Sequence, residues 1–209
     1  ALVAVAMSVL FWWLGTWQWG RHLERVERND AIATALAQEP APLATVVADP
    51  GEVPESAVYR SVTATGTYLA AEQMLQRNPR GRSGFAVVTP LVLTGGGTLW
   101  VDRGWVAASR TDINTPATDV APPTGQVEVT VRVRSPQPSS GRQAPTGQVY
   151  DITPQSMGTS SGDDLPQPVY AGYGDLVEQA PVADPNLELP PPANIGMGPH
   201  LFYALQWWS

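Results

Sequence analysis

The chain has two apolar ends around a longer, polar middle. Residues 1–19 contain no charged side chain, and a helix of this length spans about 28 Å, close to the hydrocarbon core of a bilayer. Four tryptophans gather in its second half, where an aromatic belt belongs, and Arg21 follows at the polar edge. We therefore predict a transmembrane helix over residues 1–21. The alternative, a signal peptide, lacks a small-residue cleavage site after the apolar run. Because the chain starts inside that run, we expect the native protein to extend further at its N-terminus.

The C-terminal end is also apolar and aromatic. Pro199 suits the first position of a helix, with Gly198 before it as a cap. The residues that follow, HLFYALQWWS, predict the start of a second transmembrane helix over 198–209. A full span needs about 20 residues, so we expect the native chain to continue apolar beyond Ser209. A helix lying on the membrane surface is the alternative.

Between these ends, residues 22–38 have helical composition with mixed charges and stop before Pro40. They predict an extension of the first helix out of the membrane. Residues 39–197 then contain short runs rich in β-branched and aromatic residues, separated by Gly- and Pro-rich turns. The predicted strands are 58–68, 73–78, 85–93, 98–106, 127–133, 149–152 and 169–177.

These strands predict a mainly antiparallel, barrel- or sandwich-like α+β domain held between two transmembrane helices. The triple glycine 95–97 predicts a hairpin turn. Two stretches, 135–146 and 180–192, are expected to be loops, the second leading the chain back to the membrane. Because the middle contains no spanning segment, both helices would meet the bilayer on the same side.

Composition excludes several classes of function. The chain has 12 basic residues, all arginine, against 19 acidic ones, and its net charge of -7 disfavours nucleic acid as a partner. It has no cysteine, which excludes disulfides, thiolate metal sites and a cysteine nucleophile. Its two histidines, His22 and His200, flank the predicted membrane segments, so a catalytic triad within the middle region has no base. We predict that the protein is not an enzyme.

His200 is the candidate site residue with the most specific chemistry. It lies in the first turn of the predicted C-terminal helix, where the positive helix dipole favours neutral imidazole, the form that binds haem iron or a metal ion. Tyr203, Ala204 and Trp207 share its face and could line a slot for a planar ring. The alternative is an interfacial histidine bonded to a headgroup or carbonyl. Met197 with His200 would be a soft pair for copper(I), but two ligands are too few for a site.

Polar residues also occur at the end of the first predicted helix. Gln18 and Arg21 fall on one face with Leu14. Such groups at a membrane edge contact a neighbouring helix or a ligand carboxylate. An arginine that snorkels to the headgroups is the alternative.

Four local motifs then occur in order: 14–21 (LGTWQWGR), 84–91 (GFAVVTPL), 99–106 (LWVDRGWV) and 198–207 (GPHLFYALQW). As an ordered set they resemble the Surfeit locus protein one family of cytochrome oxidase assembly factors, in a bacterial and actinobacterial form. The likeness covers nearly the whole chain. Two segments depart from the family pattern: residues 136–147 are rich in Pro and Ser, and residues 157–167 look loose and acidic where an ordered element is expected.

The resemblance implies a function for the chain. Members of the family assemble aa3-type cytochrome c oxidase and are linked to haem a insertion into its catalytic subunit. Two transmembrane helices would hold the middle domain on the periplasmic side of the plasma membrane. The oxidase subunits, the catalytic one first, a bc1–aa3 supercomplex and the lipid bilayer would be the partners.

The resemblance also implies site residues. His200 corresponds to the family's candidate ligand of haem iron, with Tyr203 beside it, and Trp17, Gln18 and Arg21 carry over from the first motif. Haem a would be held transiently rather than as a resident cofactor. His22 lies outside the motif, so a site with two histidines is our own hypothesis. Arg103, Gly104 and Trp105 match positions that serve fold and docking.

The runner-up interpretation is a stable accessory subunit of the oxidase or supercomplex. Stoichiometric co-purification with mature oxidase in mild detergent would distinguish it from a transient assembly factor.

Overall fold

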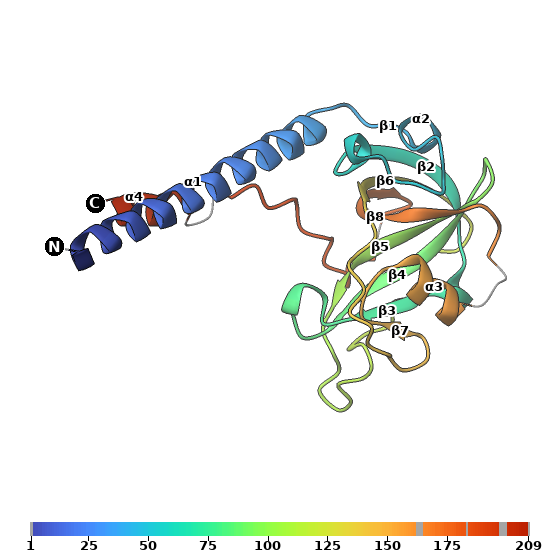
Figure 1. Ribbon diagram of the computed structural model, residues 1–209. Coiled ribbons are helices and arrows are strands. Elements are labelled where there is room, and N and C mark those ends of the chain that lie inside the picture. The colour runs from blue at the N-terminus through green and yellow to red at the C-terminus, as the bar shows by residue number, and fades with distance from the viewer. Residues whose placement is uncertain (1, 162–164, 183, 197–199, 209) are drawn as a thin grey trace. The chain divides into compact units, whose positions relative to one another are not determined.

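The computed structural model describes residues 2–161, 165–182, 184–196 and 200–208. The chain divides into two compact units (Figure 1). Unit 1 comprises residues 1–37 with 192–209, and unit 2 comprises residues 38–191. Each unit is described by itself.

Unit 1 consists of two helices and the chain that leads into the second. Helix α1 runs without interruption over Leu2–Leu36, and α4 covers His200–Trp208. The ring of Phe11 lies 5.6 Å from that of Trp207, and the Nε of Arg25 donates to the carbonyl of Gly196 at 2.9 Å. Since later residues of α1 contact earlier residues of the returning chain, the two helices are antiparallel (Figure 1).

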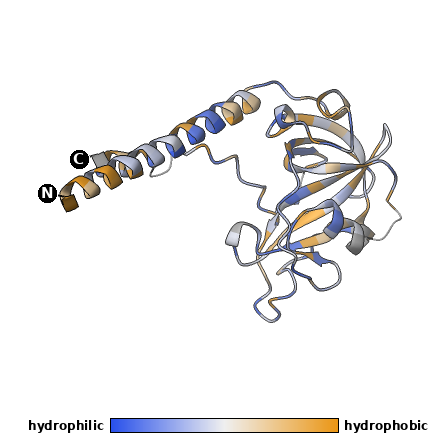
Figure 2. Cartoon of the chain, viewed as in Figure 1, coloured by the Kyte–Doolittle hydropathy of each residue, from blue (hydrophilic) through white to orange (hydrophobic). Residues whose placement is uncertain are grey.

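The side chains in the apolar half of α1 are largely not covered by the rest of the described chain. Leu2 is 88% exposed, Val3 76% and Trp12 67%, whereas Gly15 is buried. Figure 2 shows the change from this apolar half to the hydrophilic half that follows. Of the helices described, α1 alone is long and apolar enough to cross a membrane, and only 6% of its most apolar window is buried. That pattern is typical of a helix surrounded by lipid rather than by protein.

Unit 2 is built on one eight-stranded sheet. Its strands are β1 Ala41–Pro42, β2 Ser61–Tyr68, β3 Met74–Arg77, β4 Phe85–Leu93, β5 Thr98–Val106, β6 Gln126–Arg134, β7 Gln148–Val149 and β8 Val169–Ala180. Short helices accompany them: α2 Leu43–Val46, α3 Pro154–Ser161, and the 3-10 turns η1 Glu55–Ala57, η2 Ala70–Glu72 and η3 Pro79–Gly81.

The strand order is β1-β2-β6-β8-β5-β4-β3-β7, and β2 also pairs with β4. The strands β2, β6, β8, β5 and β4 therefore pair in a closed cycle. The sheet is mixed, because β8 runs parallel to β5, β1 to β2 and β7 to β3. Five of the eight pairings are antiparallel, so the prediction of a mainly antiparallel domain is confirmed, but the three parallel pairings were not predicted. The long chain between β5 and β8 allows the parallel pairing, which a hairpin cannot make.

The strongest strand predictions are confirmed at both ends. Residues 85–93 and 98–106 form β4 and β5, and the glycines between them make the expected hairpin turn. The backbone N–H of Leu93 donates to the carbonyl of Gly97 at 3.0 Å. The other predicted strands are present with shifted ends, and 135–146 is a loop as expected. The two-residue strand β1 was missed.

Helix α3 corrects the prediction of a loose segment over 157–167, as far as its described residues reach. Thr153 caps it: Oγ1 accepts from the N–H of Ser156 at 3.0 Å, and the Oγ of Ser156 accepts from the N–H of Thr153 at 3.1 Å. Pro154 occupies the first helical position. This reciprocal capping overrides the low helix propensity of the segment. Residues 162–164 lie outside the described part of the chain.

Alternating side chains of the sheet make the core of unit 2. In β6 every second residue from Val127 to Val133 is buried, and the cluster that they form includes Val62 and Leu91, both fully buried. A second cluster packs under α3 around Trp100, Met157 and Tyr173. These apolar layers fix the positions of the polar side chains described next.

Candidate functional site

A stripe of polar residues lies along the less exposed face of α1. Gln18, His22, Arg25 and Asn29 follow one another at helical spacings of four, three and four. Each is buried or half-buried, although its helix is otherwise largely exposed. The Nδ2 of Asn29 donates to the carbonyl of Ile195 at 3.0 Å, beside the bond from Arg25 to Gly196. The stripe therefore faces the chain that leads into α4.

His22 is the most deeply buried member of this stripe. It is 8% exposed, and its ring lies 5.5 Å from that of Trp19. Its Nδ1 is buried and has no hydrogen-bond partner within the described part of the chain. Along α1, His22 lies between Arg25, which contacts the chain before α4, and Phe11, which contacts α4 itself. His22 is therefore near the level at which α4 begins. The sequence analysis named His22 only in the two-histidine hypothesis. The four-three-four spacing of Gln18, His22, Arg25 and Asn29 was the signal that could have identified it as a buried polar position.

The predicted site residues of the first motif do not share one environment. Trp17 is 49% exposed, and Arg21 lies over its ring at 5.9 Å from the ring centre. The Nη1 of Arg21 donates to Glu24 at 3.1 Å. Gln18 instead is half-buried on the face of the polar stripe. The structure thus pairs Trp17 with Arg21 and places Gln18 with His22.

In α4, the predicted face is divided as well. Ala204 is fully buried and Trp207 contacts α1, but Tyr203 is 46% exposed. Gly15 of α1 and Ala204 are small, buried and at matching levels, which permits close approach of the two backbones. Met197 and the side chain of His200 lie outside the described part of the chain, so the copper pair and the two-histidine hypothesis remain predictions.

In unit 2 the motif 99–106 has a structural role. Arg103 is 1% exposed and donates to the carbonyls of Val120 at 2.8 Å and Ala121 at 3.2 Å, and to the Oε1 of Gln73 at 3.1 Å. Its guanidinium also lies 5.5 Å from the ring centre of Tyr68. Burial lowers the pKa of Arg103, and burial raises the pKa of Tyr68. Arg103 therefore fastens the chain around residue 120 to the sheet.

Trp105 holds a second piece of chain in place. The backbone N–H of Trp105 donates to the carbonyl of Glu188 at 2.7 Å, and the backbone carbonyl of Trp105 accepts from the N–H of Glu188 at 2.9 Å. Arg82 stacks over the indole at 3.8 Å and donates to both carboxylate oxygens of Glu188. Gly104 has φ +140, and a Cβ there would lie 2.7 Å from the carbonyl oxygen of Glu188. Only glycine allows this close approach.

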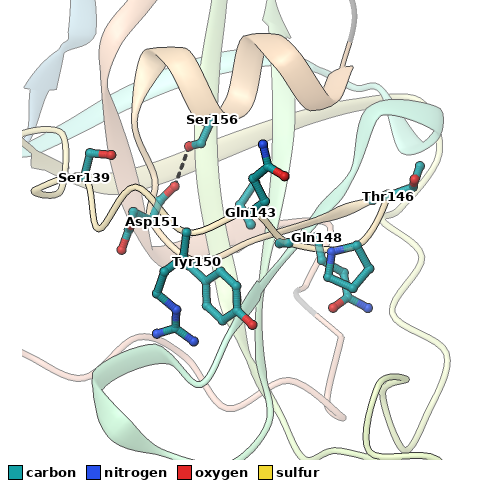
Figure 3. Close-up of a pocket in the computed structure, with 12 residues that line it drawn as sticks. Ser139, Gln143, Thr146, Gln148, Tyr150, Asp151 and Ser156 are labelled. Carbon is teal, nitrogen blue, oxygen red and sulfur yellow. Dashed lines mark hydrogen bonds between the residues drawn. The ribbon is translucent and has the colours of Figure 1, made fainter.

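Unit 2 also has several sizeable cavities, of which two lie beside α3 or the chain before it. The first, of about 370 Å³, is formed by the predicted loop and the residues after it (Figure 3). Its polar groups largely bond to one another: Ser156 donates to the carbonyl of Asp151 at 2.5 Å, and Arg142 stacks over Tyr150 at 3.6 Å. The second, of about 340 Å³, is lined by apolar residues beside α3, including Trp100 and Met157. Among the described residues, no group of three or more His, Asp or Glu could hold a metal ion.

Comparison with known proteins shows the family to which this chain belongs. The family model described as the SURF1 family matches residues 5–209. This chain belongs to the SURF1 family. SURF1-like proteins of Mycobacterium tuberculosis and Mycobacterium bovis are each 33% identical over 217 residues, covering 100% of this chain and 77% of their own length. The cytochrome oxidase assembly protein SHY1 of Saccharomyces cerevisiae is 31% identical over 108 residues, covering 50% of this chain and 27% of its own length.

The family resemblance inferred from four motifs is thus confirmed, and the mycobacterial relatives agree with its actinobacterial form. In this SURF1-family protein the first motif lies within α1 and the last opens α4. The two middle motifs supply β4 and β5. The motifs therefore lie in the antiparallel helices of unit 1 and in the β4–β5 hairpin of unit 2.

Proposed function

We propose that this SURF1-family protein is an assembly factor for aa3-type cytochrome c oxidase, and that it assists the insertion of haem a into the catalytic subunit. Family membership over residues 5–209 carries the proposal, and a relative in yeast bears the name of a cytochrome oxidase assembly protein. A non-catalytic role agrees with the composition of unit 2, which contains neither histidine nor cysteine.

In this proposal the protein spans the plasma membrane twice, with unit 2 on the extracytoplasmic side. The exposed apolar half of α1 supports the first span. For the second, α4 runs antiparallel to α1 and exposes Phe202 and Leu205, which lipid would cover. The chain then returns to the membrane beside the helix from which it left, where neighbouring oxidase subunits would be within reach.

The residues at the level where α4 begins fit a haem group. The resemblance implies His200 as the candidate ligand of haem iron, and neutral imidazole is a common axial ligand. The buried Nδ1 of His22 has no partner among the described residues, so a further polar group could contact it. Tyr203 and Trp17 offer exposed aromatic faces, and Arg21 a donor for a carboxylate. Haem a is the iron porphyrin that the oxidase requires, and this chain would hold it only in passage.

An absorption spectrum of the full chain, purified in mild detergent from cells that make haem a, tests this proposal. We expect a haem a signal that His200→Ala lowers severalfold. Phe202→Ala is the matched control, because Phe202 is 73% exposed on the same helix and has no predicted role in the site. Absence of bound haem a, together with normal oxidase maturation in cells that lack the protein, would contradict the proposal.

Purification of mature oxidase in mild detergent distinguishes the two proposed roles. An assembly factor is expected to be absent from the finished enzyme, or present well below one copy per oxidase. One copy per oxidase would instead identify this protein as an accessory subunit.

A further inference from the structure

The charged part of α1 carries three arginines close together on one face. Arg21, Arg25 and Arg28 follow at spacings of four and three, so they lie within an arc of about 60° on a helix with 3.6 residues per turn. Glu24 lies at the edge of this arc, and Glu27 and Asp30 lie further around the helix.

Only one of the three arginines has an acidic partner among the described residues. Arg21 bonds Glu24 at 3.1 Å. Arg25 uses its Nε for the carbonyl of Gly196, which leaves the terminal nitrogens of its half-buried guanidinium available. Arg28 is exposed and makes no hydrogen bond within the described part of the chain. Two guanidinium groups on one face thus have donors to offer to an external acceptor.

The position of these arginines along α1 indicates which acceptor is available. The uncharged run ends at Trp19, and Arg21 and Arg25 follow about 3 and 9 Å further along the axis. The headgroup layer on each side of a bilayer is about 5–8 Å deep. Arg21 therefore falls at headgroup level when the apolar half of α1 crosses the membrane, and the long side chains of Arg25 and Arg28 can reach back to it.

Next to this basic face lies His22, three residues before Arg25 and one turn of helix away. Its buried Nδ1 has no hydrogen-bond partner among the residues that the structure describes. A buried polar atom in this state is usually completed by a further polar group. The terminal N–H donors of Arg25 and the Nδ1 of His22 therefore lie about one helical turn apart on α1.

We propose that Arg25 and Arg28 form a binding site for the phosphate of an anionic phospholipid at the point where α1 leaves the membrane. The planar guanidinium group binds phosphate through paired N–H donors, and basic side chains at a membrane surface attract anionic lipids. The site rests on the proposed membrane placement of α1. It does not depend on haem binding or on the oxidase.

Electron paramagnetic resonance of spin-labelled lipids tests this site with the full chain in nanodiscs. Spin-labelled phosphatidylglycerol is compared with spin-labelled phosphatidylcholine in a phosphatidylcholine host. We expect the protein to prefer phosphatidylglycerol, and Arg25→Gln or Arg28→Gln to weaken that preference by about two- to fivefold. Raising the salt concentration should weaken it as well.

Glu27→Gln is the matched control, since it neutralises a charge on the same helix but on the opposite face. It should leave the preference for phosphatidylglycerol unchanged or stronger. Arg28→Gln keeps the test decisive if Arg25→Gln disturbs the contact with Gly196, because Arg28 has no such contact among the described residues.

Three results would overturn the assignment. One is equal association of the two lipids with the unaltered protein. Another is a loss of preference on Glu27→Gln as large as that on Arg28→Gln. The third is displacement of labelled phosphatidylglycerol by a soluble porphyrin dicarboxylate at equimolar concentration, which would assign these arginines to haem carboxylates instead. Loss of haem binding without loss of lipid preference would count against the proposed function alone.

Discussion

The two units of this protein distribute polar and apolar side chains in opposite ways. Unit 2 buries Val62, Val129 and Leu91 completely, and it buries Arg103 only together with three hydrogen-bond acceptors. Unit 1 exposes the large apolar side chains of α1 and buries His22, whose Nδ1 has no partner among the described residues. Unit 2 is therefore stabilised by the hydrophobic effect in water, whereas the exposed apolar surface of α1 is typical of a helix in lipid. The same kind of substitution should have different consequences in the two units.

The largest effect is expected from Arg103→Met in unit 2. This change removes the guanidinium donor from the carbonyls of Val120 and Ala121, while the Oε1 of Gln73 keeps only its hydrogen bond from Thr89. We expect a loss of about 3–5 kcal/mol in the free energy of unfolding, measured by urea denaturation followed by β-sheet circular dichroism. Arg110→Met is the control and should change it little, because Arg110 is exposed. Equal effects of the two variants would show that the buried bonds of Arg103 do not stabilise unit 2.

In unit 1 the corresponding test is Val9→Arg. Val9 is 64% exposed, so in a water-soluble helix the change would be close to neutral. At the centre of a membrane span it should cost about 2.5–3.5 kcal/mol of insertion free energy. Carbonate extraction of membranes measures the integrated fraction. The control Leu23→Arg, beyond the apolar run, should leave the integrated fraction unchanged. An integrated fraction that Val9→Arg does not lower would contradict the contrast between the two units.

Overpacking of the α1–α4 contact should have a smaller effect. Ala204 is fully buried at the level of Gly15, so Ala204→Leu should destabilise the helical pair by about 1–3 kcal/mol. The chain lacks cysteine, so a disulfide between Phe11→Cys and Trp207→Cys reports helix proximity without interference. We expect less crosslinking with Ala204→Leu. The control Phe202→Leu, on an exposed position, should crosslink normally.

The smallest effect is expected at the surface ion pair of unit 2. The hydrogen bond from Arg82 lowers the pKa of Glu188. A lowered pKa in the folded state adds stability that is present above the unfolded value of about 4.3 and is lost as pH falls through the folded value. Glu188→Gln should therefore flatten the decline in stability below about pH 5, measured by denaturant titration at several pH values. An unchanged slope would show that other carboxylates dominate.

Local sequence patterns predicted those parts of the fold that local physics determines. Strands β4 and β5 were found because both are apolar runs bounded by turn residues, and the three glycines between them permit only a tight connection. The mixed character of the sheet was missed because strand direction depends on which distant strands pair, and alternation does not encode that. Helix α3 was missed because Ser, Gly and Thr are weak helix formers, and its capping by Thr153 was not recognised.

For the candidate site, the motifs identified the right helices but not the orientation of each side chain. Trp17 and Gln18 are adjacent in the first motif, yet one is exposed and the other faces the returning chain. The sequence predicted only that the charged residues 22–38 extend the first helix out of the membrane. The contacts of Arg25 and Asn29 with the chain before α4 depend on residues more than 160 positions away. Spacing alone cannot reveal such a partner.

The insertion of unit 2 between α1 and α4 has a consequence for biosynthesis. The ribosome must produce residues 38–191 after α1 before any part of α4 emerges. Joining two helices through an unstructured chain of that length would cost about 4–5 kcal/mol of closure entropy. A folded unit 2 holds its two ends at a fixed separation and removes most of that cost. Maturation of the intervening sheet should therefore precede pairing of the helices, and slow translation through this stretch should favour correct insertion.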